Sequence, residues 1–286
     1  MRTLLLIYLL ICSVVAQAVN ISPQDSAVFE RFWKYAEDNN LKSLPVSARV
    51  PVIGSFFLNT PYIGGTLNGA ENKESPVIDL SGLDCVTFVE TVIALSFLNH
   101  YNSSSIEDFI RNIVKIRYRN GKIIDYTSRL HYSSDWLHDM NKRSIVKNIT
   151  PKDVVYKDKV YYMTTHPESY SALKSSPALQ KKMKKIENEN NARKHFYIPK
   201  NKLEKYDYLI KSGDIILITT NLKGLDTSHV GIAYRKNGKL FLMHASSREK
   251  KVVISSETLE NYLLRNSTQT GIMVGRLNPI EDSFQK

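Results

Sequence analysis

Apolar residues recur at helical spacing in the first half of the chain, whereas in the last third they form short runs typical of strands. The first helix is expected to begin at Ser22, because Pro23 at the first helical position and Asp25 in the first turn are typical of a helix start. A second apolar stretch at residues 50–58 leads into a sharp turn segment at residues 60–66. The pattern therefore predicts a helical N-terminal part ahead of a region of strands.

The middle of the chain is also predicted to be mainly helical. The apolar run at residues 86–98 is expected to form a helix after a short loop, and residues 106–116 an amphipathic helix. An aromatic-rich segment follows at residues 119–149. Residues near 165–210 are polar, basic and helical in pattern, and we interpret them as an insertion on the surface.

Short strands separated by turn signals are predicted for the last third of the chain. The expected strands are residues 214–219, 229–234, 240–244, 252–255 and 271–277. Asn237-Gly238 between two of them is a strong signal for a tight hairpin turn. Helices first and antiparallel strands later predict an α+β fold.

The first residues of the 286-residue chain have the features of a secretory signal peptide. Arg2 gives a positive start, residues 4–15 are apolar, and Ala16-Gln17-Ala18 is a small-x-small cleavage site. The apolar run is too short to span a membrane. We therefore expect a leader over residues 1–18 and a single exported domain over residues 19–286. This domain is expected to be a monomer in the periplasm, cell envelope or extracellular space, without stable membrane insertion.

Basic residues outnumber acidic ones and give the chain a formal net charge of +11. The densest basic run, at residues 181–185, has little aromatic content, so a solvated helix face explains it better than nucleic-acid binding. No nucleic-acid partner is expected. A basic exported protein is instead suited to an anionic polymer or a membrane surface.

Cys85 is the only cysteine that remains once the leader, with Cys12, has been removed. It cannot form a disulfide within the mature chain, and an unpaired thiol in an oxidising compartment suggests a functional role. The residue is expected in the first turn of a helix, where the helix dipole favours the thiolate that attacks carbonyl groups. The alternative is a small buried apolar side chain.

Two histidines of the strand-rich third, His229 and His244, are candidates for the general base that a thiol nucleophile needs. They lie on the two strands joined by Asn237-Gly238, and residues near the open end of such a hairpin are neighbours. A Cys–His–His arrangement is therefore geometrically reasonable. Two ordinary half-exposed strand histidines are the alternative.

Four motifs, taken in order, resemble those of the NlpC-type cell-wall cysteine peptidases and amidases. They are Pro61-Tyr62-Ile63-Gly64-Gly65, Asp84-Cys85, His229-Val230-Gly231-Ile232 and Met243-His244-Ala245. Each motif is weak alone, but the ordered set spans most of the mature chain. The resemblance implies a papain-like fold, in which N-terminal helices, including the cysteine helix, pack on a C-terminal antiparallel sheet that carries the histidines.

The chain departs from the common members directly after the cysteine, where Val86-Thr87 stands in place of Ser-Gly. Its extra loop before Asp84, together with Arg129-Leu130-His131-Tyr132 and His244-Ala245-Ser246-Ser247, is similar to one divergent branch associated with N-acetylmuramoyl-L-alanine amidase activity. The resemblance therefore implies a secreted hydrolase that cleaves the amide between N-acetylmuramic acid and L-alanine, in peptidoglycan or in muropeptide fragments.

The resemblance also implies roles for individual residues. Cys85 would be the nucleophile, His229 the general base and acid, and His244 the residue that orients His229. The expected oxyanion and substrate-binding residues are Tyr62, Asp84, Arg129, His131, Tyr132 and Ser246. Asp84 is ambiguous between capping the helix and touching substrate. The alternative for Arg129, His131 and Tyr132 is a packed aromatic loop.

No metal and no other cofactor is expected. A zinc amidase needs three convergent ligands, and the sequence has no His-Glu-x-x-His or comparable cluster. Two other functions stay open. One is an endopeptidase that cuts between γ-D-glutamate and a diamino acid, and the other is a non-catalytic cell-wall binding protein of the same fold.

Overall fold

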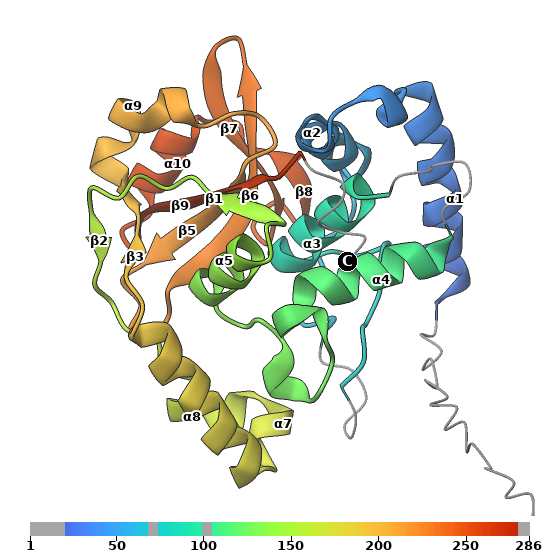
Figure 1. The fold of residues 1–286 in the computed structure, drawn as a ribbon. Helices are drawn as coiled ribbons and strands as arrows, with labels where there is room; N and C mark the ends of the chain where they lie inside the picture. Colours follow the sequence, from blue (N-terminus) through green and yellow to red (C-terminus); the bar gives the residue numbers. More distant parts are fainter. Residues whose placement is uncertain (1–20, 68–73, 99–104, 280–286) are drawn as a thin grey trace, which may run out of the picture.

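An antiparallel sheet lies between two groups of helices in the computed structural model of the protein, which describes residues 21–67, 74–98 and 105–279 (Figure 1). Within these residues the main sheet has seven strands in the order β1-β9-β5-β6-β7-β8, and β4 also pairs with β9. The strands are β1 Val146–Asn148, β4 Ile198–Pro199, β5 Ile215–Thr220, β6 Thr227–Lys236, β7 Lys239–Ser246, β8 Lys251–Ile254 and β9 Gln269–Leu277. A separate pair consists of β2 Val155–Tyr156 and β3 His195–Phe196. The α+β prediction is confirmed.

The helices either precede the first strand in sequence or lie between strands. They are α1 Pro23–Asp38, α2 Val46–Phe56, α3 Cys85–Ser96, α4 Ile106–Arg117, α5 Ser133–Lys142, α6 Tyr162–Thr165, α7 Ser171–Lys174, α8 Pro177–Asn191, α9 Leu203–Tyr206 and α10 Leu259–Arg265. Short 3₁₀ turns lie at Leu41–Ser43, Arg119–Gly121, Tyr126–Ser128, Pro167–Ser169, Lys200–Lys202 and Asp207–Leu209. The predicted start of the first helix is confirmed, because the Ser22 hydroxyl accepts a hydrogen bond from the Asp25 N–H.

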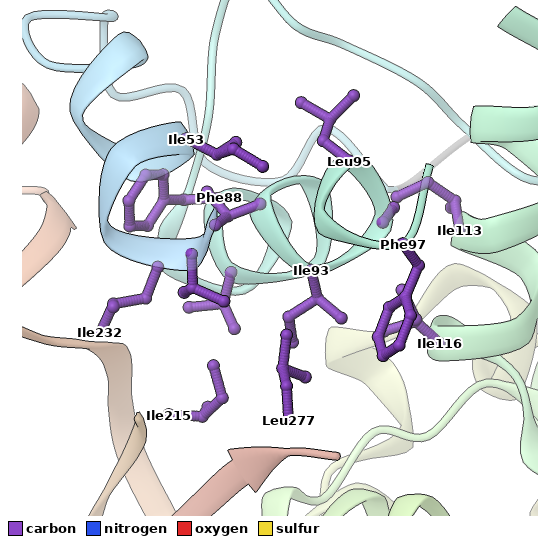
Figure 2. Close-up of a cluster of buried hydrophobic side chains, with 14 of the residues drawn as sticks. Ile53, Phe88, Ile93, Leu95, Phe97, Ile113, Ile116, Ile215, Ile232 and Leu277 are labelled. Carbon is purple, nitrogen blue, oxygen red and sulfur yellow. The ribbon is translucent and has the colours of Figure 1, made fainter. Parts of the chain in front are cut away.

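The two faces of the sheet bury different residues, because side chains alternate along each strand. Ile215 of β5 and Ile232 of β6 point into the larger core, where they meet Phe88 and Ile93 of α3 (Figure 2). Residues of the opposite parity, such as Ile216, pack with α9 and α10 on the other face. The sheet is therefore covered on both sides.

Helix α3 is at the centre of the larger core and is buried at every position from Thr87 to Ser96. A helix that is apolar all round is stable only when it is enclosed, and α3 contacts α2, α4, β6 and β7. Asp84 caps its start: the carboxylate accepts from the N–H groups of Val86 and Thr87, and the Thr87 hydroxyl accepts from the Asp84 N–H. The predicted cysteine helix is thus confirmed, and Asp84 is its cap.

The hairpin between β6 and β7 is also confirmed. Asn237 and Gly238 both have positive φ, 51° and 76°, as a tight primed turn requires. The strands stay paired from this turn to Ile232 and Met243, and pairing stops beyond that point. The two strands therefore separate at the end that carries the histidines.

The segment predicted as a surface insertion is helical in α7, α8 and α9, and Figure 1 shows α7 and α8 projecting below the sheet. It also contains β3 and β4, which the polar and basic pattern did not predict. The segment is not purely a surface feature either, because Leu173 and Met183 are buried in a small core of its own.

Among the described residues no helix is both long enough and apolar enough to cross a membrane. The predicted leader over residues 1–18 lies outside the described residues.

Candidate active site

Cys85 is held at the first position of α3 by the chain on both sides of it. The segment before the helix pairs with residues 60–63, since the Leu83 N–H donates to the Pro61 carbonyl and the Ile63 N–H donates to the Leu83 carbonyl. The same segment joins the sheet, because the Tyr62 N–H donates to the Lys250 carbonyl at 2.8 Å. The Tyr62 and Cys85 backbones are therefore fixed beside each other and beside β8.

The thiol of Cys85 lies where β6 and β7 separate. The backbone N–H of Val230, which is next to His229 in β6, interacts with the sulfur, as do the N–H groups of Cys85 and Val86. These donors favour the thiolate, but burial outweighs them and, with the Asp84 carboxylate, raises the pKa of Cys85 to about 12. The expectation that the helix dipole makes a resting thiolate is therefore not met, because the half-buried sulfur loses more to desolvation than it gains from the dipole.

His229 and His244 are in direct contact. Nε2 of His229 and Nδ1 of His244 are 2.7 Å apart, and the two rings meet edge to face. Burial lowers the pKa of His229 to about 4, and burial together with the neighbouring His229 lowers the pKa of His244 to about 3. The pair is therefore neutral at pH 7, so one ring donates and the other accepts.

Gly231 leaves room for His244 of β7 to lie against β6 where the pairing of the two strands ends. A Cβ on Gly231 would lie 2.9 Å from the Met243 carbonyl oxygen and 3.1 Å from the His244 Cβ. A Cβ at 2.9 Å from the Met243 carbonyl oxygen would force β6 and β7 apart. The His-Val-Gly-Ile motif thus supplies both the first histidine and the space for the second.

Tyr62 belongs to the same site. Burial raises the pKa of its phenol, and the nearby Cys85 and Asp84 charges add to this increase. Tyr62 is therefore a neutral hydroxyl donor beside the sulfur. The first carboxylate oxygen of Asp84 is committed to the helix cap, where it also accepts from the Thr87 hydroxyl at 2.9 Å.

Tyr262 of α10 is a site residue that the sequence did not reveal. Its ring centroid is 5.4 Å from that of His244 and 6.5 Å from that of His229. Burial raises the pKa of its phenol, and the charge on Cys85 contributes to the increase. Tyr262 lies far from the other site residues in sequence, and no motif marks it.

A pocket of about 690 Å³ adjoins this group and shares His244 and Tyr262 with it. The other side chains that line it come from the β7–β8 turn, β8, the approach to α10 and the end of α10. Ser246 lines the pocket, and its hydroxyl accepts from the Glu249 N–H at 3.0 Å. Ser246 therefore lines the same pocket as His244, and its contact with substrate stays a prediction.

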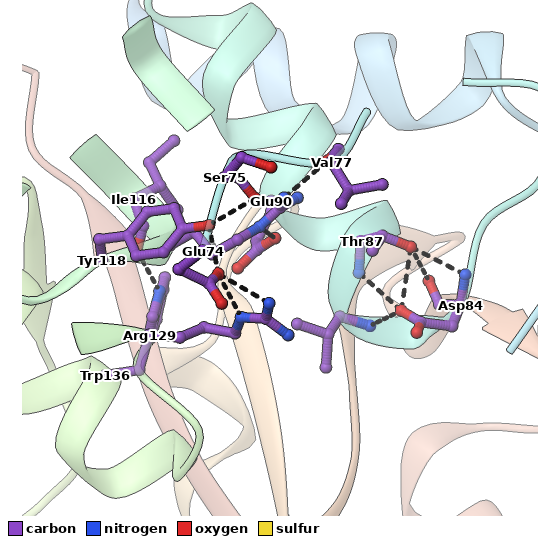
Figure 3. Close-up of polar contacts among 12 residues, drawn as sticks. Glu74, Ser75, Val77, Asp84, Thr87, Glu90, Ile116, Tyr118, Arg129 and Trp136 are labelled. Carbon is purple, nitrogen blue, oxygen red and sulfur yellow. Dashed lines mark hydrogen bonds and ion pairs between the residues drawn. The ribbon is translucent and has the colours of Figure 1, made fainter. Parts of the chain in front are cut away.

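Arg129 is engaged in a buried polar network behind α3 (Figure 3). Its guanidinium donates to Glu74 at 2.7 Å and 3.1 Å, and the Tyr118 hydroxyl donates to the same carboxylate oxygen at 2.7 Å. A second pair, Arg117 and Glu90, lies beside it at 2.7 Å. These pairs tie the chain that leads to Cys85 to the helices behind it.

His131 and Tyr132 are also committed to internal contacts. The His131 Nε2 lies 3.0 Å from the Tyr126 carbonyl oxygen, and the ring packs on that of Tyr126. The Tyr132 hydroxyl donates to Glu187 at 2.9 Å, and the side chain is buried in the core of the insertion. Both residues have the contacts of a packed aromatic loop, which the sequence had left open as an alternative.

Comparison with known proteins shows the family of the chain. The family described as AmiA-like, N-acetylmuramoyl-L-alanine amidase-like, matches residues 52–272, a range that contains Cys85 and both histidines. The chain belongs to this family. A search of functionally curated proteins gave no match.

Solved structures agree with the AmiA-like assignment. An N-acetylmuramoyl-L-alanine amidase from Bacteroides uniformis is 40% identical, with a TM-score of 0.77 over 82% of this chain and 99% of that one. A Bacteroides fragilis protein described as a candidate xylanase is 42% identical, with a TM-score of 0.74 over 79% and 99%. A Legionella pneumophila protein of the family DUF1460 is 26% identical, with a TM-score of 0.63 over 88% and 97%.

The described part of this AmiA-like chain contains no group of three or more His, Cys, Asp or Glu side chains placed to hold a metal ion. The chemistry available at the site is that of a thiol, two neutral imidazoles and two phenols. Such a set is suited to acyl transfer, in which a nucleophile must lose a proton as it attacks.

Proposed function

We propose that the protein is a cysteine-dependent amidase that hydrolyses the bond between the lactyl group of N-acetylmuramic acid and L-alanine. The observation that carries the proposal is the thiol at the start of α3 beside Val230, next to a histidine that contacts a second histidine at 2.7 Å. Membership of the AmiA-like family supports the substrate class, peptidoglycan or its muropeptide fragments.

The neutral pair suggests how the proton moves. If His229 donates its Nε2–H to His244, its Nδ1 keeps a lone pair that accepts the proton of the Cys85 thiol. The sulfur then bonds to the lactyl carbonyl carbon, and the oxyanion forms near the Cys85 N–H and the Tyr62 hydroxyl. His229 gives its proton to the amine of L-alanine as the C–N bond breaks. Water, deprotonated by His229, then bonds to the acyl carbon, the C–S bond breaks to release the lactyl acid, and His229 returns the proton to the sulfur.

The high pKa of the thiol fits this order of events. A thiol held neutral by burial has to lose its proton during attack, so the general base is essential. His244 contacts Nε2 of His229 at 2.7 Å, so it is suited to fix the tautomer and the orientation of His229.

We further propose that the domain is a divergent NlpC-type, papain-like enzyme. The cysteine at a helix N-terminus, the antiparallel sheet with histidines on neighbouring strands and the ordered motifs support this assignment. Export of residues 19–286 after removal of a leader, and action as a monomer, are parts of the same proposal.

The site is less well suited to a glycosidase or to a non-catalytic binding protein. A glycosidase needs two carboxyl groups across the scissile bond, whereas the carboxylate next to the sulfur, Asp84, serves as a helix cap. A non-catalytic binding protein has no need of a thiol that touches a histidine-bearing strand. An endopeptidase acting after γ-D-glutamate would use the same thiol and histidines, so the products have to decide between the two.

The test is mass spectrometry of muropeptides digested with the protein and with Cys85→Ala. We expect intact stem peptide and free muramoyl sugar from the native protein. Cys85→Ala is expected to lose at least about 10⁴-fold in rate while keeping its fold, because the change removes only the nucleophilic atom. Release of an L-Ala-D-Glu dipeptide would support the endopeptidase, and full activity of Cys85→Ala would exclude the thiol mechanism.

A further inference from the structure

Tyr262 of α10 contacts both histidines of the candidate active site. Its ring lies edge to face with that of His244, at an angle of 76° and a centroid distance of 5.4 Å, and at 29° and 6.5 Å from that of His229. We infer that Tyr262 is a positioning residue, whose ring holds the histidine pair in the arrangement that leaves Nδ1 of His229 free to take the proton of Cys85. This inference rests on the proposed amidase function.

The histidine pair has two possible arrangements, and only one of them suits a base. Because both rings are neutral, a single proton lies between Nε2 of His229 and Nδ1 of His244, which are 2.7 Å apart. If His229 donates, both rings carry their proton on Nε2, and Nδ1 of His229 keeps its lone pair. If His229 accepts, both rings carry their proton on Nδ1, and His229 has no free lone pair for the thiol proton. The reaction therefore needs a contact that favours the first arrangement.

Tyr262 offers such a contact at His244. In the first arrangement His244 carries an Nε2–H that His229 does not use, and no hydrogen-bond partner for it lies among the described residues. His244 is only 3% exposed, so an N–H without a partner there is costly. An edge-to-face contact brings the positive edge of one ring to the negative face of the other, and an imidazole N–H is well suited to that position. The Tyr262 ring therefore favours a proton on Nε2 of His244.

The Tyr262 ring is itself held in place. Leu259 and Leu263 of α10 are fully buried in the core on that side of the sheet, and the Tyr262 ring packs against the same core. The buried Gln269 side chain donates a hydrogen bond to the phenol oxygen, because burial raises the pKa of Tyr262 whereas this contact lowers it. The phenol oxygen is thus anchored at β9, so the ring, and not the hydroxyl, is the part that acts on the histidines.

Tyr262 also lines the pocket of about 690 Å³ beside His244, so the wall of a binding site is the competing role. The two roles have different kinetic signatures. A pocket wall acts on substrate binding and changes KM, whereas a positioning residue changes kcat and the protonation of the histidines.

The first measurement is muropeptide hydrolysis by the full chain. Tyr262→Leu keeps an apolar side chain but removes the ring, and it should lower kcat about 10- to 100-fold per folded molecule and leave KM within about threefold. Tyr262→Phe keeps the ring and should recover most of that loss. Tyr208→Leu is the matched control, since it removes a tyrosine that is 75% exposed outside the site and should leave both constants unchanged. Tyr262→Met gives the same comparison should Tyr262→Leu fail to fold.

The second measurement is the protonation of each imidazole nitrogen, read from long-range ¹H–¹⁵N NMR correlations at pH 7 and assigned with His229→Ala and His244→Ala. We expect protons on Nε2 of both histidines in the native protein and in Tyr262→Phe, and a mixture with Nδ1 protons in Tyr262→Leu. Protons on Nδ1 in the native protein, or unchanged protonation in Tyr262→Leu, overturn the inference.

Two kinetic results also overturn it: a loss confined to KM in Tyr262→Leu, and a kcat of Tyr262→Phe as low as that of Tyr262→Leu. Failure of the amidase proposal is seen separately, in the digestion products of the native protein. The NMR measurement does not depend on turnover, so it tests the arrangement of the histidines whichever bond the protein cleaves.

Discussion

His131 and the His229–His244 pair both have lowered pKa values, yet they differ in the groups that surround them. Burial lowers the pKa of His131 to about 3 and that of His229 to about 4. The His131 Nε2 is bound to the Tyr126 carbonyl, and its ring packs against Tyr126. Among the described residues His229 uses its Nε2 on His244 and has no hydrogen-bond partner at its Nδ1. His229 lies in β6, the strand that contacts the sulfur.

The difference shows that a displaced pKa alone does not identify a reaction centre. Both regions combine histidine, tyrosine and a charged neighbour, and both are desolvated. In the segment around His131 the Arg129 guanidinium, the His131 Nε2 and the Tyr132 hydroxyl are each bound to another part of the protein. The region around Cys85 instead brings a thiol close to β6, which carries His229, and the two contacting histidines, and His244 also lines a pocket.

The largest expected effect is on the rate of hydrolysis when a histidine of the His229–His244 pair is replaced. His229→Ala should reduce the rate of muropeptide hydrolysis about as far as Cys85→Ala, because a thiol with a pKa near 12 cannot ionise without a base. His244→Ala should cost only about 10- to 100-fold, since it orients a base that remains present. The test is the rate of hydrolysis per folded molecule of each variant, with folding checked by circular dichroism, and equal losses in the two variants would contradict the prediction.

His131→Gln is the matched control for these variants. It removes a buried imidazole but can still donate a hydrogen bond to the Tyr126 carbonyl, and it should keep the rate within about threefold of the native protein. A loss comparable to that of His229→Ala would mean that the segment around His131 takes part in the reaction after all.

The second effect concerns stability instead of rate. Arg129→Ala leaves Glu74 buried with only the Tyr118 hydroxyl as a partner, and it should lower the free energy of unfolding by about 3 kcal/mol. Activity of the molecules that remain folded should change little. Lys182→Ala breaks an exposed pair with Asp125 and should cost less than about 1 kcal/mol. Urea unfolding of both variants tests the difference, and equal costs would contradict it.

The third effect is on the reactivity of the thiol. In protein lacking residues 1–18, iodoacetamide should label Cys85 roughly 10- to 100-fold more slowly than free cysteine at pH 7, since the raised pKa leaves little thiolate. Labelling should accelerate as the pH rises and reach the ordinary rate in urea. Faster labelling than free cysteine at pH 6 would restore the expectation of a resting thiolate.

Helix α3 and the aromatic segment at residues 119–149 show which features could be predicted from the sequence and which could not. The cap at Asp84, the apolar helix and the Asn237-Gly238 turn are local patterns, so they predicted the helix, the hairpin and the meeting of His229 with His244. The role of Tyr132 depends on Glu187, 55 residues away, and no local pattern reports such a partner. For the same reason, local patterns did not show that Tyr262 lies beside His244, or that burial outweighs the helix dipole at Cys85.

The smallest effect tests whether His131 is structural, through the dependence of stability on pH. Its pKa is about 3 in the folded protein and near 6.5 when unfolded, so between these values the unfolded chain binds a proton that the folded chain does not. Stability from this residue is therefore complete above pH 6.5 and is lost as the pH falls toward 3. Between pH 7.5 and 5.5, His131→Gln should lose about 1 kcal/mol less than the native protein. His138→Gln, at an exposed position, should change the slope less. Urea unfolding across this range decides the matter, because an unchanged slope in His131→Gln would show that the imidazole is already protonated or solvated in the folded state.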